Sequence, residues 1–531
     1  MIKNAVLLVF IIISQAGCKS VGDYNEEVTK NHSIVDLQAD VAKAYHQLQR
    51  NHPRLYQYIS KEQLDTSFDS LQKSIKEPLT SMQFYLKLAP VVKMIGQGHI
   101  SVVPPQKRRT RKVRNTYKDK KFDFYTSQFK YIDNHLILTR AINGDSLLVG
   151  SELLAVESET PQELIERYNT NVASDGYNKT FFESFVGNRF QRFYARENGF
   201  LDSLLVTYKL RDSVFKQNYT WVDTKMKKDS TKLDSIIISA KPKKLTKEEK
   251  KTRKLENRKK RKDHSKYGYL PKINLNTRNM RYIGKDSTTA YMKIRSFTNG
   301  KYEAFYEESF KILDSLETKN LIIDLRDNGG GRLTEINDLY KHLALEDFTF
   351  INESEVTTRT PFLNMAMSNT SGPIVHGLVA VFSPIIVGHN LLKTQKRDGK
   401  IYYCFKQSKE QSPYENNYKG ALYVLINGNS FSASSVFSTN LKGTGRATFV
   451  GQETGGAYNG TVAGLFKPFR LPTSNVTIRM GLMQIDAPFK IDPDGYGVTP
   501  DVEINAATLE DYQLDKDPAI EWVLDAIENE K

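Results

Sequence analysis

Two segments of the sequence place reactive residue types directly after hydrophobic runs that read as strands. In the first, residues 321–325 are followed by RDNGGG at 326–331, and three consecutive glycines offer unpaired backbone NH groups at the start of a helix. In the second, residues 422–426 are followed by NGNSFSASS at 427–435. A serine at a strand-to-helix turn is held exposed in front of a helix N-terminus, which is the geometry that a nucleophile and its oxyanion hole require.

Each segment alone also has a simpler interpretation. The glycines fit a flexible turn, and phosphate binding would need Gly-Lys-Ser or Gly-Lys-Thr where Arg332-Leu333 follows instead. The serines fit an ordinary helix cap, and the Gly-x-Ser-x-Gly nucleophile elbow is absent. Neither segment by itself therefore predicts a function.

The elements that must hold these segments alternate between strands and helices after residue 267. Strands are expected at 290–294, 321–325 and 422–426, and helices at 303–316, 333–345 and from 433 to 441. Upstream, helical periodicity covers 33–75, with an interruption at Pro53, and 81–95, which leads to GQGH at 96–99 and a strand at 100–103. The alternation predicts an α/β core behind an N-terminal helical region.

The two segments together resemble the tail-specific, C-terminal processing serine peptidases, including their tricorn-core-like branch. AYMKIRSF at 290–297, FVGQETGG at 449–456 and GVTPD at 497–501 resemble further segments of that family. The resemblance covers about 270–510 strongly and the upstream parts weakly. It implies a crotonase-like α/β spiral peptidase core that needs no cofactor and acts on protein tails or unfolded polypeptides.

The same resemblance implies which residues act. The middle serine of the family's Ser-x-Ser-x-Ser string is Ser432, the nucleophile, and the oxyanion donors match the backbone NH groups of Gly330 and Ala433. Ala457 stands where processing peptidases with a Ser-Lys dyad carry their lysine, so that base is missing. The tricorn-like branch takes its base from a Gly-His turn instead, and His99 matches it.

The acid that orients the histidine in this branch precedes GVTPD, and Asp494 matches it best. Asp492 is the alternative, and either residue also fits a turn aspartate. Ser432 would then attack the scissile carbonyl, His99 would take and return the proton, and Asp494 would fix the imidazole tautomer. A metal site has no support, because the sequence has no His-Glu-x-x-His motif and no cysteine pair.

The N-terminus predicts export. Lys3, an apolar run at 5–13 and Ala16-Gly17 form a secretory signal, and the run is shorter than the roughly 20 residues that span a bilayer. Cys18 after Ala-Gly resembles a bacterial lipoprotein box, which implies a lipidated N-terminus; ordinary cleavage near Gly17 is the alternative. We expect the bacterial cell envelope, on the periplasmic side or surface, with a lipid anchor in the outer membrane.

Two short segments hold the whole excess of positive charge. The net charge is +15, and residues 241–262 contribute 13 basic and 3 acidic residues while 107–121 contribute 9 and 1. The remainder is 15 − 10 − 8 = −3, so nucleic acid is not expected as a partner. The Lys-rich stretch from about 225 to 265 predicts a disordered or loosely helical insert, which is either a solvated loop or a contact to anionic lipid.

At 531 residues, 39% of them hydrophobic, the chain is expected to fold as several domains. We expect a signal peptide (1–18), an N-terminal helical region (19–110), a PDZ-like module (111–220), a basic insert (221–268), the peptidase core (269–512) and a C-terminal helix (513–531). The PDZ-like assignment rests on VGSELLAV at 149–156, without a visible carboxylate-binding loop upstream.

These features predict an exported serine endopeptidase, with a polypeptide as substrate and the membrane as a partner through the lipid anchor. The alternative is a catalytically inactive, polypeptide-binding envelope lipoprotein of the same fold. A third possibility is an envelope tether that uses the basic insert. The oligomeric state is left open.

Overall fold

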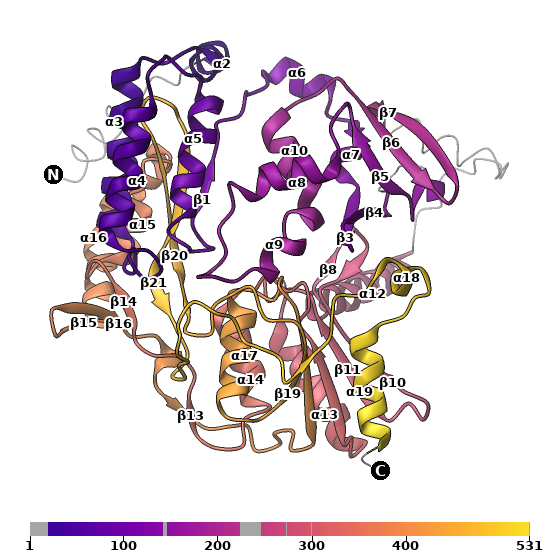
Figure 1. The fold of residues 1–531 in the computed structure, drawn as a ribbon. Coiled ribbons are helices and arrows are strands. Elements are labelled where there is room, and N and C mark those ends of the chain that lie inside the picture. The colour runs from indigo at the N-terminus through magenta and orange to yellow at the C-terminus, as the bar shows by residue number, and fades with distance from the viewer. Residues whose placement is uncertain (1–19, 142–145, 224–245, 272, 299, 530–531) are drawn as a thin grey trace.

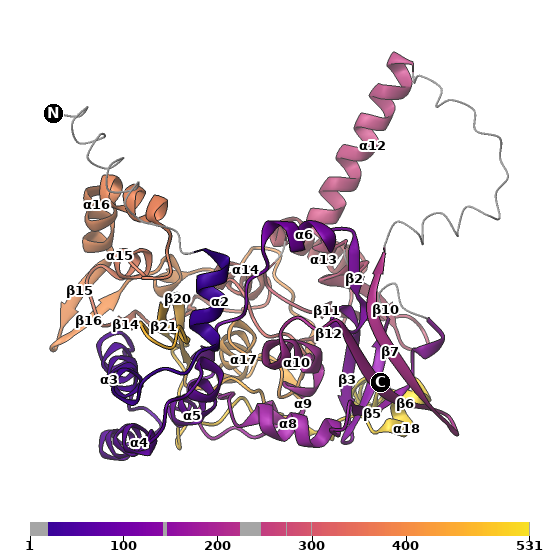
Figure 2. The ribbon, with the colours of Figure 1, turned by 90° about the horizontal axis from the view of Figure 1, so that it is seen from above.

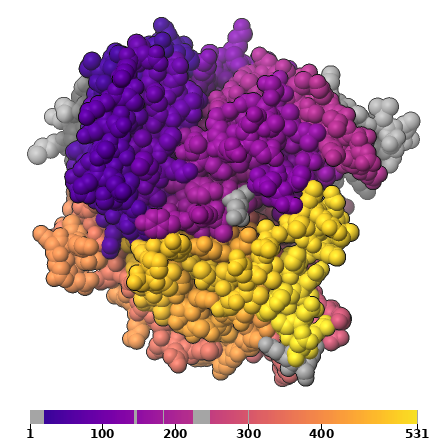
Figure 3. Space-filling view, viewed as in Figure 1, coloured from indigo at the N-terminus to yellow at the C-terminus, as the bar shows by residue number. Residues whose placement is uncertain are grey.

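The structure, a computed structural model, describes residues 20–141, 146–223, 246–271, 273–298 and 300–529. N-terminal helices and a sheet module lie side by side above a core of helices and strands (Figure 1, Figure 3). The mixed α/β fold class predicted from the sequence is confirmed.

Four helices open the described chain, and each begins after a serine or threonine whose side chain accepts a backbone NH. They are α2 Val21–Thr29, α3 Ile34–Asn51, α4 Lys61–Ser74 and α5 Ser81–Lys93. Helix α3 buries Leu37, Val41 and Leu48 at the predicted helical spacing. Asp40, on the same helix, is buried and accepts hydrogen bonds from the NH and hydroxyl of Ser474, both at 2.7 Å. The helical region is therefore attached to the C-terminal half of the chain.

The middle of the chain forms a six-stranded antiparallel sheet in the order β2-β7-β6-β5-β4-β3, called here the sheet module. Its strands are β2 Lys120–Phe122, β3 Gln128–Ile132, β4 His135–Arg140, β5 Glu152–Val156, β6 Ser203–Leu210 and β7 Ser213–Asp223. Its helices are α6 Arg111–Thr116, α7 Asp123–Thr126, η1 Ser146–Leu148, α8 Pro161–Asn169, α9 Thr180–Ser184, η2 Gly187–Arg189 and α10 Phe190–Asn198. Phe124, Leu138, Leu164 and Val206 belong to a hydrophobic cluster of the module's own. The domain boundaries given above stay predictions.

The core is built on a second sheet in the order β10-β11-β12-β18-β19-β22, parallel except for β10. Its strands are β10 Arg278–Ile283, β11 Thr289–Ile294, β12 Asn320–Asp324, β18 Ala421–Ile426, β19 Thr448–Gly451 and β22 Val502–Glu503. Helices α13 Tyr302–Ser315, α14 Leu333–Lys341 and α17 Ala433–Gly443 pack on one face, and α19 Pro518–Asn529 packs on the other. The side chains of Leu321 and Ile323 pack on the first face and that of Ile322 packs on the second, because successive side chains of a strand point to opposite faces of the sheet.

A third sheet joins parts of the chain that are far apart in sequence. Its order is β1-β21-β14-β16-β15, with β20 paired to β21. Its strands are β1 Ser101–Val103, β14 Ser354–Val356, β15 Thr394–Arg397, β16 Lys400–Tyr403, β20 Thr461–Arg470 and β21 Thr477–Ile485. The smaller elements are β8 Tyr269–Leu270, β9 Leu275–Asn276, β13 Phe348–Thr349, α15 Pro361–Ala366, η3 Lys406–Ser408, β17 Glu410–Gln411 and α18 Leu509–Gln513. Strand β1 follows α5 and pairs antiparallel with β21, so the N-terminal region adds a strand to the C-terminal half of the fold.

The basic segments are more ordered than expected. Lys247–Lys266 forms helix α12, which begins at a capping box between Thr246 and Glu249 and projects from the body (Figure 2). The segment 107–121 contains the short helix α6. Residues 224–245, and the N-terminal 1–19 with Cys18, lie outside the described residues.

Helix α16, Pro373–Lys393, was not foreseen from the sequence patterns. Among the described residues it is the one helix long and apolar enough to cross a membrane by length and composition. Only Val379 and Asn390 of its 21 residues are buried.

His52, which follows α3, is buried with both ring nitrogens lacking a hydrogen-bond partner within the described chain. Burial lowers its pKa from 6.5 to about 3, because the charged imidazolium would lose its hydration. The folded state therefore binds this proton only far below the pH at which the unfolded chain binds it. The stability that a neutral His52 contributes is present above pH 6.5 and is lost as the pH falls toward 3.

When the pH falls from 6.5 to 5, His52 gains a proton in the unfolded chain but not in the folded protein. We expect this difference to lower the free energy of unfolding by about 1.5 kcal/mol. His52→Phe removes the titration and keeps an aromatic ring, so its unfolding free energy should decline less over that interval than the wild type's. Urea unfolding at the two pH values measures the difference. Equal declines in the two proteins would contradict the burial argument.

Candidate active site

Parallel pairing of β12 with β18 brings the two polar junctions of the sequence together, because neighbouring parallel strands end at the same sheet edge. The loops that follow are bonded to one another. The NH of Asp327 donates to Asn427 Oδ1 and the NH of Phe431 donates to the carbonyl of Asn328, both at 3.0 Å. The hydroxyl of Ser434 donates to the same carbonyl at 2.8 Å. The junctions thus form one rigid unit.

Ser432 occupies the N-cap position of α17 in a conformation that side chains rarely adopt. Its φ is 58° and its ψ is −119°, and its hydroxyl does not cap the helix. A Cβ on Gly330 would come within 2.8 Å of the Ser432 Cβ, so the glycine loop can approach this turn only because it has no side chain there. The strained turn places the half-buried Ser432 hydroxyl at the start of the helix, which is a position that suits a nucleophile.

His99 meets this hydroxyl from the other end of the chain. Its Nε2 lies 2.9 Å from Ser432 Oγ, and its ring lies between those of Phe431 and Phe466, with centroid distances of 4.9 and 5.7 Å. The pairing of β1 with β21 fixes the chain two residues after the histidine. Burial, with a smaller contribution from the charge of Arg479, lowers the pKa of His99 to about 3. The imidazole is therefore neutral at physiological pH and can accept a proton.

The second nitrogen of the ring contacts a threonine. His99 Nδ1 lies 2.9 Å from Thr461 Oγ1, and a proton on Nδ1 would leave Nε2 free to accept from Ser432. Asp175 lies behind Thr461, buried, with Oδ1 accepting the NH of Gly98 at 2.8 Å. Its Oδ2 has no hydrogen bond of good geometry within the described residues. Burial raises the pKa of Asp175 to about 6, and the nearby NH of Gly98 and hydroxyl of Thr461 oppose that rise.

Asp494 does not take the place predicted for it, and this corrects the sequence assignment. Its carboxylate accepts a hydrogen bond from Gln57 Nε2 at 2.9 Å and from the NH of Gly495, while the imidazole contacts Thr461. Asp492, the alternative acid, is exposed. Chain order cannot show that a loop far upstream, and not the nearby aspartate, supplies the buried carboxylate.

The two predicted oxyanion donors lie at the site in different states. Among the described residues, the NH of Ala433 has no hydrogen-bond acceptor, as a donor awaiting a developing charge would. The NH of Gly330 donates to Asn328 Oδ1 at 2.9 Å, in a turn closed by the asparagine side chain. A two-donor oxyanion hole therefore requires this side chain to release or share the Gly330 NH.

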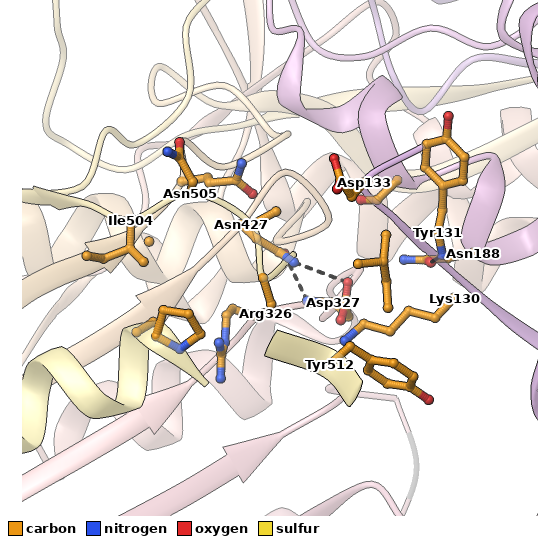
Figure 4. Close-up of a pocket in the computed structure, with 18 of the residues that line it drawn as sticks. Lys130, Tyr131, Asp133, Asn188, Arg326, Asp327, Asn427, Ile504, Asn505 and Tyr512 are labelled. Carbon is orange, nitrogen blue, oxygen red and sulfur yellow. Dashed lines mark hydrogen bonds between the residues drawn. The ribbon is translucent and has the colours of Figure 1, made fainter. Parts of the chain in front are cut away.

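A cavity of about 1190 Å³ lies between the sheet module and the core. Asp327 and Asn427 of the junction loops line it, whereas Ser432 and His99 do not. Lys130, Tyr131 and Asn188 of the module line it together with Asp327 and Asn427 of the core, and Figure 4 shows the side chain of Lys130 extending toward Asp327. Its mixed polar and apolar lining suits an extended polypeptide better than a small apolar ligand.

The floor of this cavity is an ion-pair network at the end of β12. Arg326 donates to Asp324 at 2.8 Å and to Asp517 at 2.7 Å, which connects the strand end to the start of α19. Burial alone would raise the pKa of Asp324, but Arg326 and Lys293 hold it well below its usual range. A charge-paired floor keeps the strand end in one position.

Thr461 and Asp175 are the site residues that sequence reasoning missed. Thr461 begins β20 and Asp175 lies in a loop before α9, and neither stands in a motif. A polar loop residue with no periodic context gives no sequence signal of burial. Within the described ranges, no group of three or more His, Cys, Asp or Glu side chains is arranged to hold a metal ion.

The two carboxylates can be compared by the reactivity of Ser432 toward a fluorophosphonate. Asp175→Asn should slow labelling at least about tenfold, because the neutral amide no longer supports the proton on His99 Nδ1 through Thr461. Asp494→Asn is the matched control and should label within about threefold of wild type, because Asp494 contacts Gln57 and not the imidazole. The reverse ranking would restore Asp494 as the acid.

Comparison with known proteins gives a family and a fold. Residues 288–504 match the model of peptidase family S41. The structure is similar to mature CPAF complexed with lactacystin, with a TM-score of 0.57 and 15% identity over 93% of this chain and 97% of that chain. It is equally similar to a serine-to-alanine mutant of CPAF, with a TM-score of 0.57 and 14% identity over 91% of this chain and 94% of that chain.

At these identities the two structures show a shared fold, and a search of curated proteins finds no match. The family model covers the segment that holds both junctions and Ser432. Residues 288–504 therefore match the model of peptidase family S41, and together with the shared fold this match supports the predicted assignment to the tail-specific proteases.

Proposed function

We propose that this peptidase is an exported, lipid-anchored serine endopeptidase that cleaves protein tails or unfolded polypeptides through an acyl-enzyme on Ser432. The observation that carries the proposal is the 2.9 Å contact between a half-buried serine in a strained conformation and a neutral histidine. A strained turn at this position has no structural use that an ordinary serine cap would not serve better. We propose anchoring at Cys18, in the outer membrane of a bacterial envelope, because the leader resembles a lipoprotein signal.

In the proposed reaction Ser432 Oγ attacks the scissile carbonyl as its proton passes to His99 Nε2. The Nδ1 proton stays on the imidazolium, which the Thr461 hydroxyl and the carboxylate of Asp175 stabilise. The NH of Ala433 holds the oxyanion, and the NH of Gly330 joins it when Asn328 gives up its bond. His99 then protonates the leaving amine, and water repeats the sequence to release the acyl group.

The inactive polypeptide-binding protein remains a second candidate because of one observation. The NH of Gly330 is bonded to Asn328, so the hole is incomplete in this conformation. Binding of a substrate would complete the hole in a peptidase, whereas a binding protein would never use it. Fluorophosphonate labelling of Ser432 separates the two, since the probe reports an activated serine without a substrate.

The cavity between the sheet module and the core is proposed to hold a part of the polypeptide away from the scissile bond, because neither Ser432 nor His99 lines it. A peptide that binds as PDZ ligands do would pair as an additional strand with β3, the edge strand of the module. There the NH of Tyr131 already donates to Asn188 Oδ1 at 2.8 Å, so η2 covers this part of the edge. The polypeptide would therefore displace Asn188 or pass beside it.

Hydrolysis should depend on Ser432 and His99 together. Ser432→Ala and His99→Ala should each lower kcat on an unfolded casein by at least about 10³-fold while folded stability stays near wild type, because they remove the nucleophile or its base. Release of amine groups, with urea unfolding as the control, measures both effects. Turnover that persists in His99→Ala would reject the histidine as base.

The pH dependence should report Asp175 and not His99. His99, with a pKa of about 3, is neutral throughout the range, whereas Asp175 gains its negative charge as the pH rises through about 6. The value of kcat/KM on a fluorogenic peptide should therefore rise through pH 6 and level above it. In Asp175→Asn the rise of kcat/KM near pH 6 should vanish. If the pH profile of this variant is unchanged, the rise belongs to another titrating group.

A further inference from the structure

Helix α16 presents an uncharged, apolar surface to solvent. The sequence from Pro373 to Leu392 contains no Asp, Glu, Lys or Arg. Leu378, Val381 and Ile385 are 54%, 66% and 70% exposed, and Leu392 is 87% exposed. A contiguous patch of this kind on a water-soluble body marks an interaction surface.

The other side of the helix is fixed to the protein. His376 Nε2 lies 3.0 Å from the carbonyl of Ser368 near the start of the helix, and Asn390 Oδ1 accepts the NH of Phe362 at 3.1 Å near its end. Both ends are therefore tied to the segment 361–368, which holds α15. A helix held to the body near both of its ends can enter a membrane interface sideways but cannot cross the bilayer while these contacts persist.

Basic side chains follow the helix directly. Residues 393–400 contain four basic residues, Lys393, Lys396, Arg397 and Lys400, and one acidic residue, Asp398. Arg397 and Lys400 pair with glutamates of the preceding strand region, but within the described chain neither Lys393 nor Lys396 is in an ion pair. In Figure 1 and Figure 2, α16 and the β15–β16 hairpin form the outermost elements of the same side of the molecule. The apolar and basic surfaces can therefore meet one plane.

We propose that α16 and the β15–β16 hairpin are a membrane-docking surface, on which the apolar side chains of α16 enter the headgroup region of a bilayer and Lys393 and Lys396 contact anionic phospholipid. An uncharged helix followed by free lysines is complementary to an anionic lipid surface. The surface lies apart from Ser432 and His99, and it adds to the proposed lipid anchor a contact that orients the peptidase.

The test uses residues 19–531, which include every described residue, with vesicles of phosphatidylethanolamine and phosphatidylglycerol at 3:1. Wild type should float with these vesicles and bind phosphatidylcholine vesicles at least about fivefold more weakly. Leu378→Gln/Val381→Gln/Ile385→Gln should lose at least about tenfold in binding, while its fluorophosphonate labelling stays unchanged. Val214→Gln/Leu316→Gln/Leu514→Gln changes side chains of similar exposure elsewhere and should bind as wild type.

A second measurement is independent of the triple variant's stability. Tryptophan fluorescence of Val381→Trp should shift to the blue on vesicle addition and be quenched by lipids brominated near the headgroup, whereas Val214→Trp should not respond. Absence of vesicle binding by wild type, or equal binding of the two triple variants, would overturn the proposal. So would a wild-type dimer in light scattering that the α16 triple variant converts to monomer, because a second copy would then cover the helix.

Discussion

The parallel pairing of β12 with β18 is the constraint on which the site depends. It places two loops, separated by about a hundred residues, at one sheet edge, where Asn328 bonds to Phe431 and Ser434. These bonds over-determine the turn, which is why Ser432 can remain at a positive φ that costs on the order of 1–3 kcal/mol. Without the pairing, the glycine loop would have no partner and the serine would relax into an ordinary helix cap.

His99, the proposed base, is held by a different sheet, and its position depends on burial as much as on hydrogen bonds. His99 reaches Ser432 because β1 pairs with β21 and because Gly98, next to the Phe431 ring, leaves room for the approach. The same burial that locates the imidazole keeps it neutral, and it keeps Asp175 close to its neutral form near pH 6. Position and protonation state therefore have one cause, the exclusion of water from the junction between the helical region and the core.

The accessory parts of the chain extend from this centre in two directions. The sheet module closes a cavity against the ends of the core strands, where Arg326 holds Asp324 and Asp517 together. Helix α16 leads into the β15–β16 hairpin, which forms one end of the third sheet, and β1 forms the other end of the same sheet. A membrane contact through α16 would thus be rigidly coupled to the strand that positions His99, which fixes how the catalytic centre faces the bilayer.

Local patterns in the sequence were enough to predict the elements of the core, the nucleophile segment and the glycine loop. Strand runs such as 321–325 and the helical spacing of Leu37 and Val41 are patterns of this kind, and they can be read without knowledge of the fold. The resemblance then indicated His99, because a Gly-His turn between a helix and a strand is also a local feature. Asp494 was chosen in the same way, by its distance in sequence from GVTPD, and there the local pattern was misleading.

Long-range packing, in contrast, places Thr461 and Asp175 behind the histidine in the position expected for Asp494. Packing also lets Asn328 occupy the NH of Gly330 and leaves α16 facing solvent. Burial of a single polar side chain, and exposure of an apolar helix, depend on which distant segments pack against them. Sequence spacing carries no information about that packing, because the contacts that remove water from Asp175 come from segments far apart in the chain.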